Sequence, residues 1–131
     1  MRIFLFLLLV GMIAGCKNPA DQYVKRFEMV DISKIQIPDT VVNQGIAFIR
    51  AKAQGDNDCW SHMYFEMKKT KDFEYTLKAY GTFESFGVCS GGMVYKDSTF
   101  TFEPEVAGTY RILISRIPLA TQIDSIVVVE E

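Results

Sequence analysis

The chain has 131 residues, of which 49% are hydrophobic, 13% aromatic and 23% charged, and its formal net charge is -2. This length fits one ordinary domain, and the apolar and aromatic content is too high for a disordered chain. The slightly negative charge argues against a nucleic-acid-binding protein, which needs an excess of lysine and arginine on one face.

The N-terminal segment, residues 1–15, is apolar behind a single positive charge. All of its residues except Arg2, Gly11 and Gly15 are hydrophobic. A short apolar stretch of this kind is typical of a secretory signal peptide, and Lys17 ends it before the roughly 20 residues that a membrane-spanning helix needs. We therefore expect residues 1–15 to be absent from the mature protein.

The end of this segment, Ile13-Ala14-Gly15-Cys16, resembles the lipobox of bacterial lipoproteins, in which an aliphatic residue and two small residues precede a cysteine. The resemblance implies that a diacylglycerol is attached to the Cys16 thiol and that the signal peptide is cleaved before Cys16. It also implies a cell-envelope protein that is anchored in the membrane by lipid. Lys17 is not the aspartate that retains enterobacterial lipoproteins in the inner membrane, so the outer membrane is favoured, with the domain facing the periplasm or the surface.

Residues 16–30 are polar and charged around Pro19, which predicts a lipidated tether before a domain at 31–131. A short helix is expected at 23–29 within this tether. From residue 32 onward, apolar and polar residues alternate with a period of two, and turn residues recur at short intervals. Both features are typical of half-buried β-strands. The expected strands are 32–37, 46–53, 60–67, 73–79, 83–88, 99–103, 109–115 and 123–129, with turns at 54–58 and 68–72.

Seven or eight short strands in about 100 residues predict an all-β domain, and an antiparallel β-sandwich is favoured over a small barrel. The segment 100–114, with Gly108-Thr109-Tyr110, resembles the next-to-last hairpin of immunoglobulin-like domains. The resemblance implies an immunoglobulin-like sandwich in which the Tyr110 hydroxyl binds back to the preceding loop. The mature chain also resembles small lipoproteins of Bacteroidetes that carry one such domain with an extra disulfide, a resemblance that implies no activity.

Cys59 and Cys89 remain as a pair once Cys16 is assigned to the anchor. In an oxidising compartment such a pair is expected to form a disulfide. A zinc or redox site is the alternative, but the chain has one histidine and no Cys-x-x-Cys motif. We therefore expect no metal and no cofactor.

No group of residues predicts an enzyme. His62 is the only histidine, and without a Gly-x-Ser-x-Gly motif it is expected to be a solvated surface residue. Asp56-Asn57-Asp58 lacks the glycine and glutamate of a calcium-binding loop and predicts a turn. Glu103 and Glu105 are expected to form an exposed acidic corner rather than the carboxylate pair of a glycosidase.

Aromatic residues are the remaining candidates for binding, although core packing is the favoured explanation for them. The candidates are chiefly Trp60, Tyr64 and Tyr80, with Phe83, Phe86 and Tyr95. The sequence therefore predicts a lipid-anchored interaction or accessory module with a protein partner. A carbohydrate-binding module that uses exposed aromatic residues is the alternative, and an enzyme is the least favoured interpretation.

Overall fold

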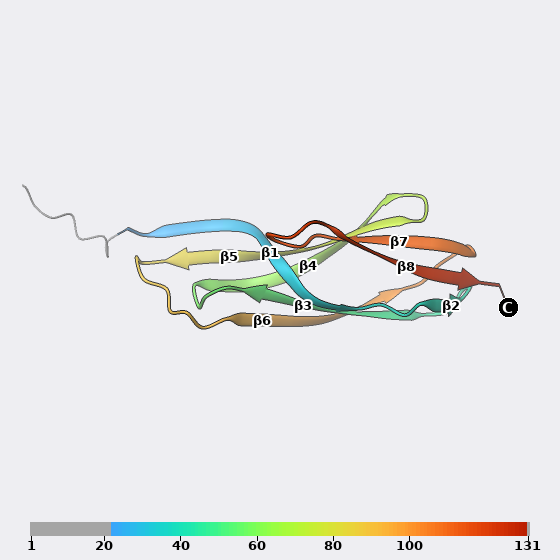
Figure 1. The fold of residues 1–131 in the computed structure, drawn as a ribbon, viewed down its shortest axis with the longest axis horizontal. Helices are drawn as coiled ribbons and strands as arrows, with labels where there is room; N and C mark the ends of the chain where they lie inside the picture. Colours follow the sequence, from blue (N-terminus) through green and yellow to red (C-terminus); the bar gives the residue numbers. More distant parts are fainter. Residues whose placement is uncertain (1–21, 131) are drawn as a thin grey trace, which may run out of the picture.

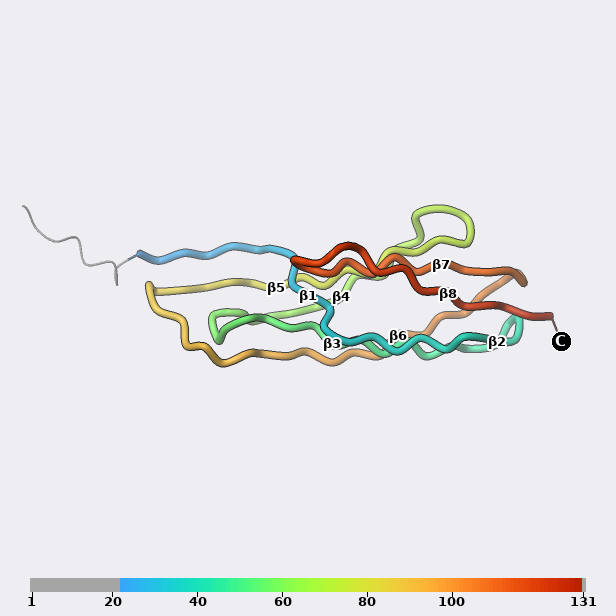
Figure 2. The backbone as a smooth tube through the Cα atoms, viewed as in Figure 1, coloured from blue at the N-terminus to red at the C-terminus, as the bar shows by residue number. Residues whose placement is uncertain are grey.

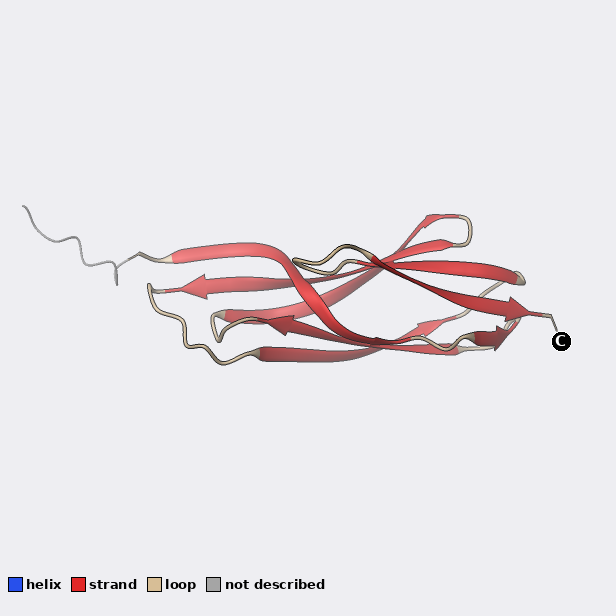
Figure 3. Cartoon of the chain, viewed as in Figure 1, coloured by secondary structure: helices blue, strands red, loops and turns tan. Residues whose placement is uncertain are grey.

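The structure is a computed structural model that describes residues 22–130, and every regular element among them is a β-strand (Figure 3). The expected all-β class is therefore confirmed. The strands in chain order are β1 (Val24–Gln36), β2 (Thr40–Val42), β3 (Ala47–Gly55), β4 (Trp60–Lys71), β5 (Glu74–Ser85), β6 (Val94–Phe102), β7 (Gly108–Ile114) and β8 (Gln122–Val129) (Figure 1).

These eight strands form one curled, mixed sheet in the order β2-β8-β7-β5-β1-β3-β6, and β4 pairs with the other edge of β5. Most neighbours are antiparallel, but β2–β8 and β5–β7 are parallel. β5 and β7 run in the same direction because β6 lies between them in the chain and runs back beside β3 (Figure 1). The sheet is therefore mixed, whereas the sequence predicted antiparallel pairing throughout.

The curl of the sheet follows β1, which pairs with a different strand along each half of its length. Its first half, through Val30, pairs with β5, and its second half, from Asp31, pairs with β3. Figure 2 shows the chain bending between these halves. Asp31 lies at the bend, where its Oδ1 accepts hydrogen bonds from Arg116 Nε and from the Ile117 backbone N–H, both at 3.0 Å. One strand thus joins two groups of strands around a common core.

The core lies on the concave side of the sheet, because alternate residues of each strand point inward. In β3 the alternation is complete, with Ile49 buried between the exposed Phe48 and Arg50. Aromatic contacts cross the core from β4 and β5 to β6, with ring centroids 5.4 Å apart in each pair. The largest fully buried side chains are Ile32, Ile49, Leu77, Ile112, Ile114 and Ile126.

The expected helix at 23–29 is wrong, because β1 already begins at Val24. Residues 24–30 therefore belong to the sheet rather than to the tether. The charges of this segment, which suggested a solvated tether, have partners across the sheet. Lys25 Nζ lies 3.9 Å from Glu84 Oε2, and the Arg26 guanidinium lies 4.7 Å from the centre of the Phe83 ring. Pairing with a distant strand thus overrides the local composition.

The hairpin between β4 and β5 is tighter than the expected turn at 68–72. β4 continues to Lys71, and the turn consists of Asp72 and Phe73. Phe73 has a φ of 59°, and its ring packs edge-on against Tyr110 at 4.9 Å. The lysine-rich residues 68–71 therefore belong to the end of β4 instead of forming a loop. Lys69 Nζ lies 3.1 Å from Asp72 Oδ1, which connects this end of the strand to the turn.

β5 is one continuous strand, whereas the sequence predicted two strands on either side of Gly81. The glycine lies in a closely packed part of the strand and does not break it. A Cβ at this position would lie 3.1 Å from Met63 Cγ and 3.2 Å from Trp60 Cε3. The sequence pattern also missed the short β2 and the first half of β6, where apolar alternation is weak.

Replacing Ile49 with alanine is expected to lower the free energy of unfolding by about 3 kcal/mol, because its fully buried side chain would leave a cavity. Ile123 is a matched control, since it lies in β8 and is 56% exposed. Ile123→Ala should cost less than about 0.5 kcal/mol. Urea denaturation followed by circular dichroism measures both values, and equal losses in the two variants would contradict this placement of the core.

Candidate functional site

Three aromatic side chains gather on the convex face of the sheet, one from each of the neighbouring strands β1, β5 and β4. Those of β1 and β4 are exposed, and Tyr80 of β5 is half-buried. The Tyr80 ring centre lies 5.6 Å from those of Phe27 and Tyr64, which lie 5.9 Å from each other. Phe27 is 57% exposed and Tyr64 47% exposed, and Met29 is exposed beside them. We call Phe27, Met29, Tyr64 and Tyr80 the aromatic face.

Strand register places these side chains together. Tyr80 of β5 lies directly opposite Tyr64 of β4 on one edge and opposite Met29 of β1 on the other. Phe27 is two residues before Met29 and therefore points to the same side of the sheet. Side chains that face each other across neighbouring strands lie within contact distance, so the pairing itself builds the aromatic face.

The three rings form a broad surface rather than a closed stack. Their planes differ by only 13°, 16° and 29°, so the rings are close to parallel. Parallel rings in full contact lie about 3.5–4 Å apart, and a stack of three would separate its outer rings by about 7 Å or more. The largest distance between ring centres here is 5.9 Å, so the three rings do not form one stack and at least two of them lie side by side.

A β-bulge separates Trp60 from the aromatic face. The β4–β5 register shifts between Ser61 and Tyr64, where His62 has a φ of 48°. In a regular strand, Trp60 and Tyr64 would point to the same side, but one extra residue reverses that relation. Trp60 instead faces inward, and its ring packs edge-on against Phe83 with centroids 5.4 Å apart.

Trp60 borders a hollow of about 330 Å³ beside the bend of β1. Its Nε1 donates a hydrogen bond of 2.8 Å to Asp56 Oδ1. Asp31 and Gln54 also line the hollow and bring further polar groups to it. The sequence grouped Trp60 with Tyr64 and Tyr80, but the structure places it at a partly polar hollow that neither of these two rings lines.

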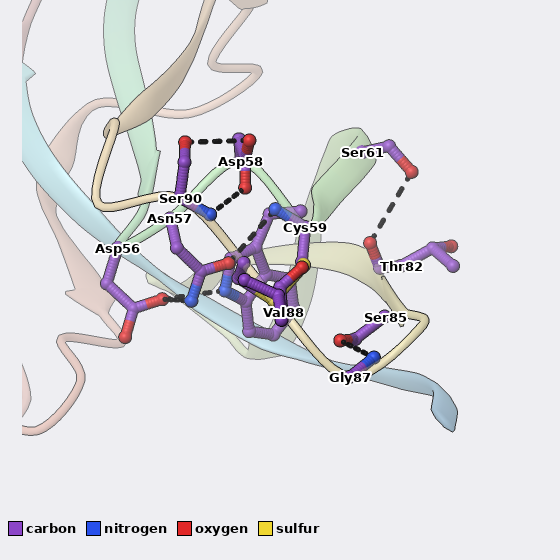
Figure 4. The surroundings of a disulfide bond; sticks show 12 residues. Asp56, Asn57, Asp58, Cys59, Ser61, Thr82, Ser85, Gly87, Val88 and Ser90 are labelled. Atoms are coloured by element: carbon purple, nitrogen blue, oxygen red, sulfur yellow. Dashed lines mark hydrogen bonds between the residues drawn. A yellow bond between two sulfur atoms is a disulfide. The ribbon is translucent and has the colours of Figure 1, made fainter. Parts of the chain in front are cut away.

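The structure contains the expected disulfide between Cys59 and Cys89, with a Cα–Cα distance of 5.5 Å (Figure 4). It joins the β3–β4 turn to the loop that follows β5. Two hydrogen bonds of 2.7 Å reinforce the connection, from the backbone N–H and the hydroxyl of Ser90 to the Asp58 carboxylate. These bonds favour the charged carboxylate and lower the pKa of Asp58. The segment 56–58 thus forms the turn that its composition predicted.

The titratable residues considered from the sequence do not converge on one site. His62 is exposed, and its Nδ1 lies 3.0 Å from Ser61 Oγ. Glu103 and Glu105 are both exposed on the loop after β6. Within residues 22–130, no three histidine, cysteine, aspartate or glutamate side chains lie close enough together to bind a metal ion.

Tyr110 makes the contact that the sequence resemblance implied for it. Its hydroxyl donates a hydrogen bond of 2.9 Å to the backbone carbonyl of Val106, four residues earlier. Its ring is buried against Phe102 and Phe73, at centroid distances of 5.0 and 4.9 Å. This hydroxyl thus fixes the loop between β6 and β7 to the core.

The predicted lipobox, including Cys16, lies outside the described residues. None of the elements in 22–130 is a helix long and apolar enough to span a bilayer. Comparisons with protein-family models, curated proteins and solved structures find no match.

The structure brings together two of the three predicted binding aromatics, Tyr64 and Tyr80, and adds Phe27 to them. Phe27 was not among the predicted binding residues, because it lay in the expected helix at 23–29. The period-two spacing of Phe27 and Met29, which share one face of β1, was the signal that could have found it.

Replacing both Cys59 and Cys89 with serine is expected to lower the free energy of unfolding by about 3.5 kcal/mol, because the bridge closes a loop with a sequence separation of 30. Denaturation with and without reductant measures the loss. Thiol labelling of the unreduced mature protein is an independent check. Labelling of both cysteines in that protein would contradict the disulfide.

Proposed function

We propose that this protein is a lipid-anchored protein of the bacterial cell envelope, with one immunoglobulin-like β-sandwich that binds a protein partner through the aromatic face. The lipid is carried by Cys16, and the outer membrane is the proposed location. The apolar segment before Ile13-Ala14-Gly15-Cys16 supports the anchor. The domain serves as an interaction or accessory module and not as an enzyme.

Two features support the immunoglobulin-like arrangement. The Tyr110 hydroxyl binds back to Val106, as the corner tyrosine does in such domains. Aromatic contacts also join opposite sides of the core, with Phe65 against Phe100 and Tyr75 against Phe102. Two layers of strands that pack on each other in this way are the basis of a β-sandwich.

The exposure of the aromatic face is the observation that carries the binding proposal. Tyrosine, phenylalanine and methionine are enriched in protein interfaces, where they contribute large contact areas. The rings of Phe27, Tyr64 and Tyr80 are close to parallel, with centres 5.6 to 5.9 Å apart, and so offer a broad area. A broad apolar surface suits the face of another protein.

Strand addition at an edge of the sheet is less favoured than binding to this face. The edge strand β4 contains a bulge and carries Lys68, Lys69 and Lys71 near its end. The edge strand β6 carries the exposed charges of Lys96 and Asp97. Bulges and edge charges are features that discourage pairing with another strand.

Glycan binding is the second candidate function, and the hollow beside Trp60 is the observation that favours it. An indole next to carboxylate and amide groups combines apolar contact with the hydrogen bonding that sugar hydroxyls need. Asp31, Gln54 and Asp56 provide these groups. The hollow shares Met29 with the aromatic face but none of its three rings, so the two functions can be tested with different variants.

Tyr64→Ser is expected to weaken capture of the protein partner by at least about tenfold, because it removes one of the rings of the contact area. Tyr95→Ser is the matched control, since Tyr95 is similarly exposed but lies on β6. Crosslinking and pull-down of the anchored protein from its native envelope measure the capture. Equal capture by the two variants would contradict the assignment to this face.

Trp60→Ala should leave capture of the protein partner unchanged, provided that circular dichroism shows a folded variant. If the intact protein binds envelope glycans and Trp60→Ala abolishes that binding, while no protein partner is captured, the second candidate is correct. Retention on immobilised glycans measures this outcome.

Cys16→Ser is expected to leave an uncleaved precursor without lipid, because no thiol remains for the diacylglycerol. Metabolic labelling with palmitate and the mass of the N-terminal peptide measure the result. Label incorporated equally into the variant and the original protein would contradict lipidation at Cys16.

A further inference from the structure

The loop between β5 and β6, residues 86–93, presents apolar side chains to solvent at one end of the sheet. We call it the disulfide loop, because Cys89 lies within it. Val88 is 83% exposed and Phe86 is 70% exposed, the two highest values among the large hydrophobic residues described, and Met93 is also exposed. The loop sequence, Phe-Gly-Val-Cys-Ser-Gly-Gly-Met, contains no charged residue.

The backbone of the disulfide loop is held in place, so these side chains cannot easily turn inward. Cys89 is bonded to Cys59, and Ser90 binds the Asp58 carboxylate through two hydrogen bonds (Figure 4). At the start of the loop, the Gly87 N–H donates to Ser85 Oγ at 3.1 Å. Gly87 has a φ of 108°, a conformation that favours glycine. Fixed, exposed apolar side chains are a feature of surfaces that bind.

The disulfide loop lies at the end of the sheet where the chain enters the domain (Figures 1 and 2). The rings of Tyr23 and Phe86 lie 5.0 Å apart, which joins the entering chain to the loop. The Tyr23 hydroxyl also donates a hydrogen bond of 2.7 Å to Glu84, and this carboxylate raises the pKa of the tyrosine. The loop and the entering chain therefore form one apolar end.

The length of the chain between this end and Cys16 limits their separation. Six residue steps lead from Cys16 to Gln22, and at about 3.6 Å per step they span at most about 22 Å. β5 alone has 12 residues, or about 40 Å at about 3.3 Å per residue. A lipid on Cys16 therefore brings the disulfide loop within reach of the bilayer, while the opposite end of the sheet can stay clear of it.

We propose that Phe86, Val88 and Tyr23 contact the interfacial layer of the membrane that holds the lipid of Cys16. The inference rests on the proposed lipid anchor. Aromatic residues favour the membrane–water interface, and adjacent apolar side chains add buried area. Because residues 86–93 are uncharged, the contact depends on apolar insertion and should not change with salt or with the fraction of anionic lipid. A second attachment beside the lipid fixes how the domain stands on the membrane.

The test uses the complete lipidated protein in vesicles of phosphatidylethanolamine and phosphatidylglycerol that contain a doxyl-labelled lipid quencher. Trp60 is the only tryptophan, so a Trp60→Phe background allows one new indole to be followed. Phe86→Trp places this indole in the disulfide loop. Val106→Trp is the matched control, because Val106 is exposed on the loop between β6 and β7, at the opposite end of the sheet (Figure 1).

Quenching of the Phe86→Trp protein is expected to exceed that of the Val106→Trp protein by about threefold or more, with no change at high salt. Equal quenching of the two, or none in either, would overturn the membrane contact, and crosslinking of this loop to a protein instead of lipid would also overturn it. The mass of the N-terminal peptide, measured in the same samples, tests the anchor separately. If the acyl chains are absent, the proposed anchor is wrong, and the same quenching comparison with added vesicles decides the loop contact alone.

Discussion

The fold depends on the division of β1 between two partners. A strand pairs through its backbone along both edges, so one strand that pairs with β5 and then with β3 forces both to curve around the same core. The bend is fixed by Asp31, whose carboxylate is bound by Arg116 and by the backbone of Ile117. The curl, the enclosed isoleucines and the convex aromatic face all follow from this arrangement.

A second local feature, the bulge at His62, separates two surfaces that one strand would otherwise combine. It directs Trp60 toward the core and the hollow near Asp56, and Tyr64 toward solvent beside Tyr80. Because of this one additional residue, the start of β4 packs against the core through Trp60, and its middle presents Tyr64 to solvent. The same strand supports both candidate binding functions without mixing their residues.

Much of the fold could be predicted because buried strands leave a period-two pattern, as around Ile49, Leu77 and Ile112. The bend of β1 could not be predicted. The charged residues of its first half resemble a solvated tether, and only the pairing with β5 identifies them as part of the sheet. Only part of the aromatic face could be predicted, for the same reason. Tyr64 and Tyr80 lie in regular alternation, whereas Phe27 joins them only through pairing with a distant strand, and Trp60 leaves them through a bulge that no sequence pattern marks.

The pairing of β1 with β5 also sets an order of events when the chain is made. Val24 pairs with Ser85, 61 residues later in the chain, so β1 cannot complete its hydrogen bonding until β5 has been made. Contacts between residues so far apart in sequence form slowly, because a long loop must close first. Until then Phe27 and Met29 belong to a strand without its partner, and the first strand to be made is among the last to complete its pairing.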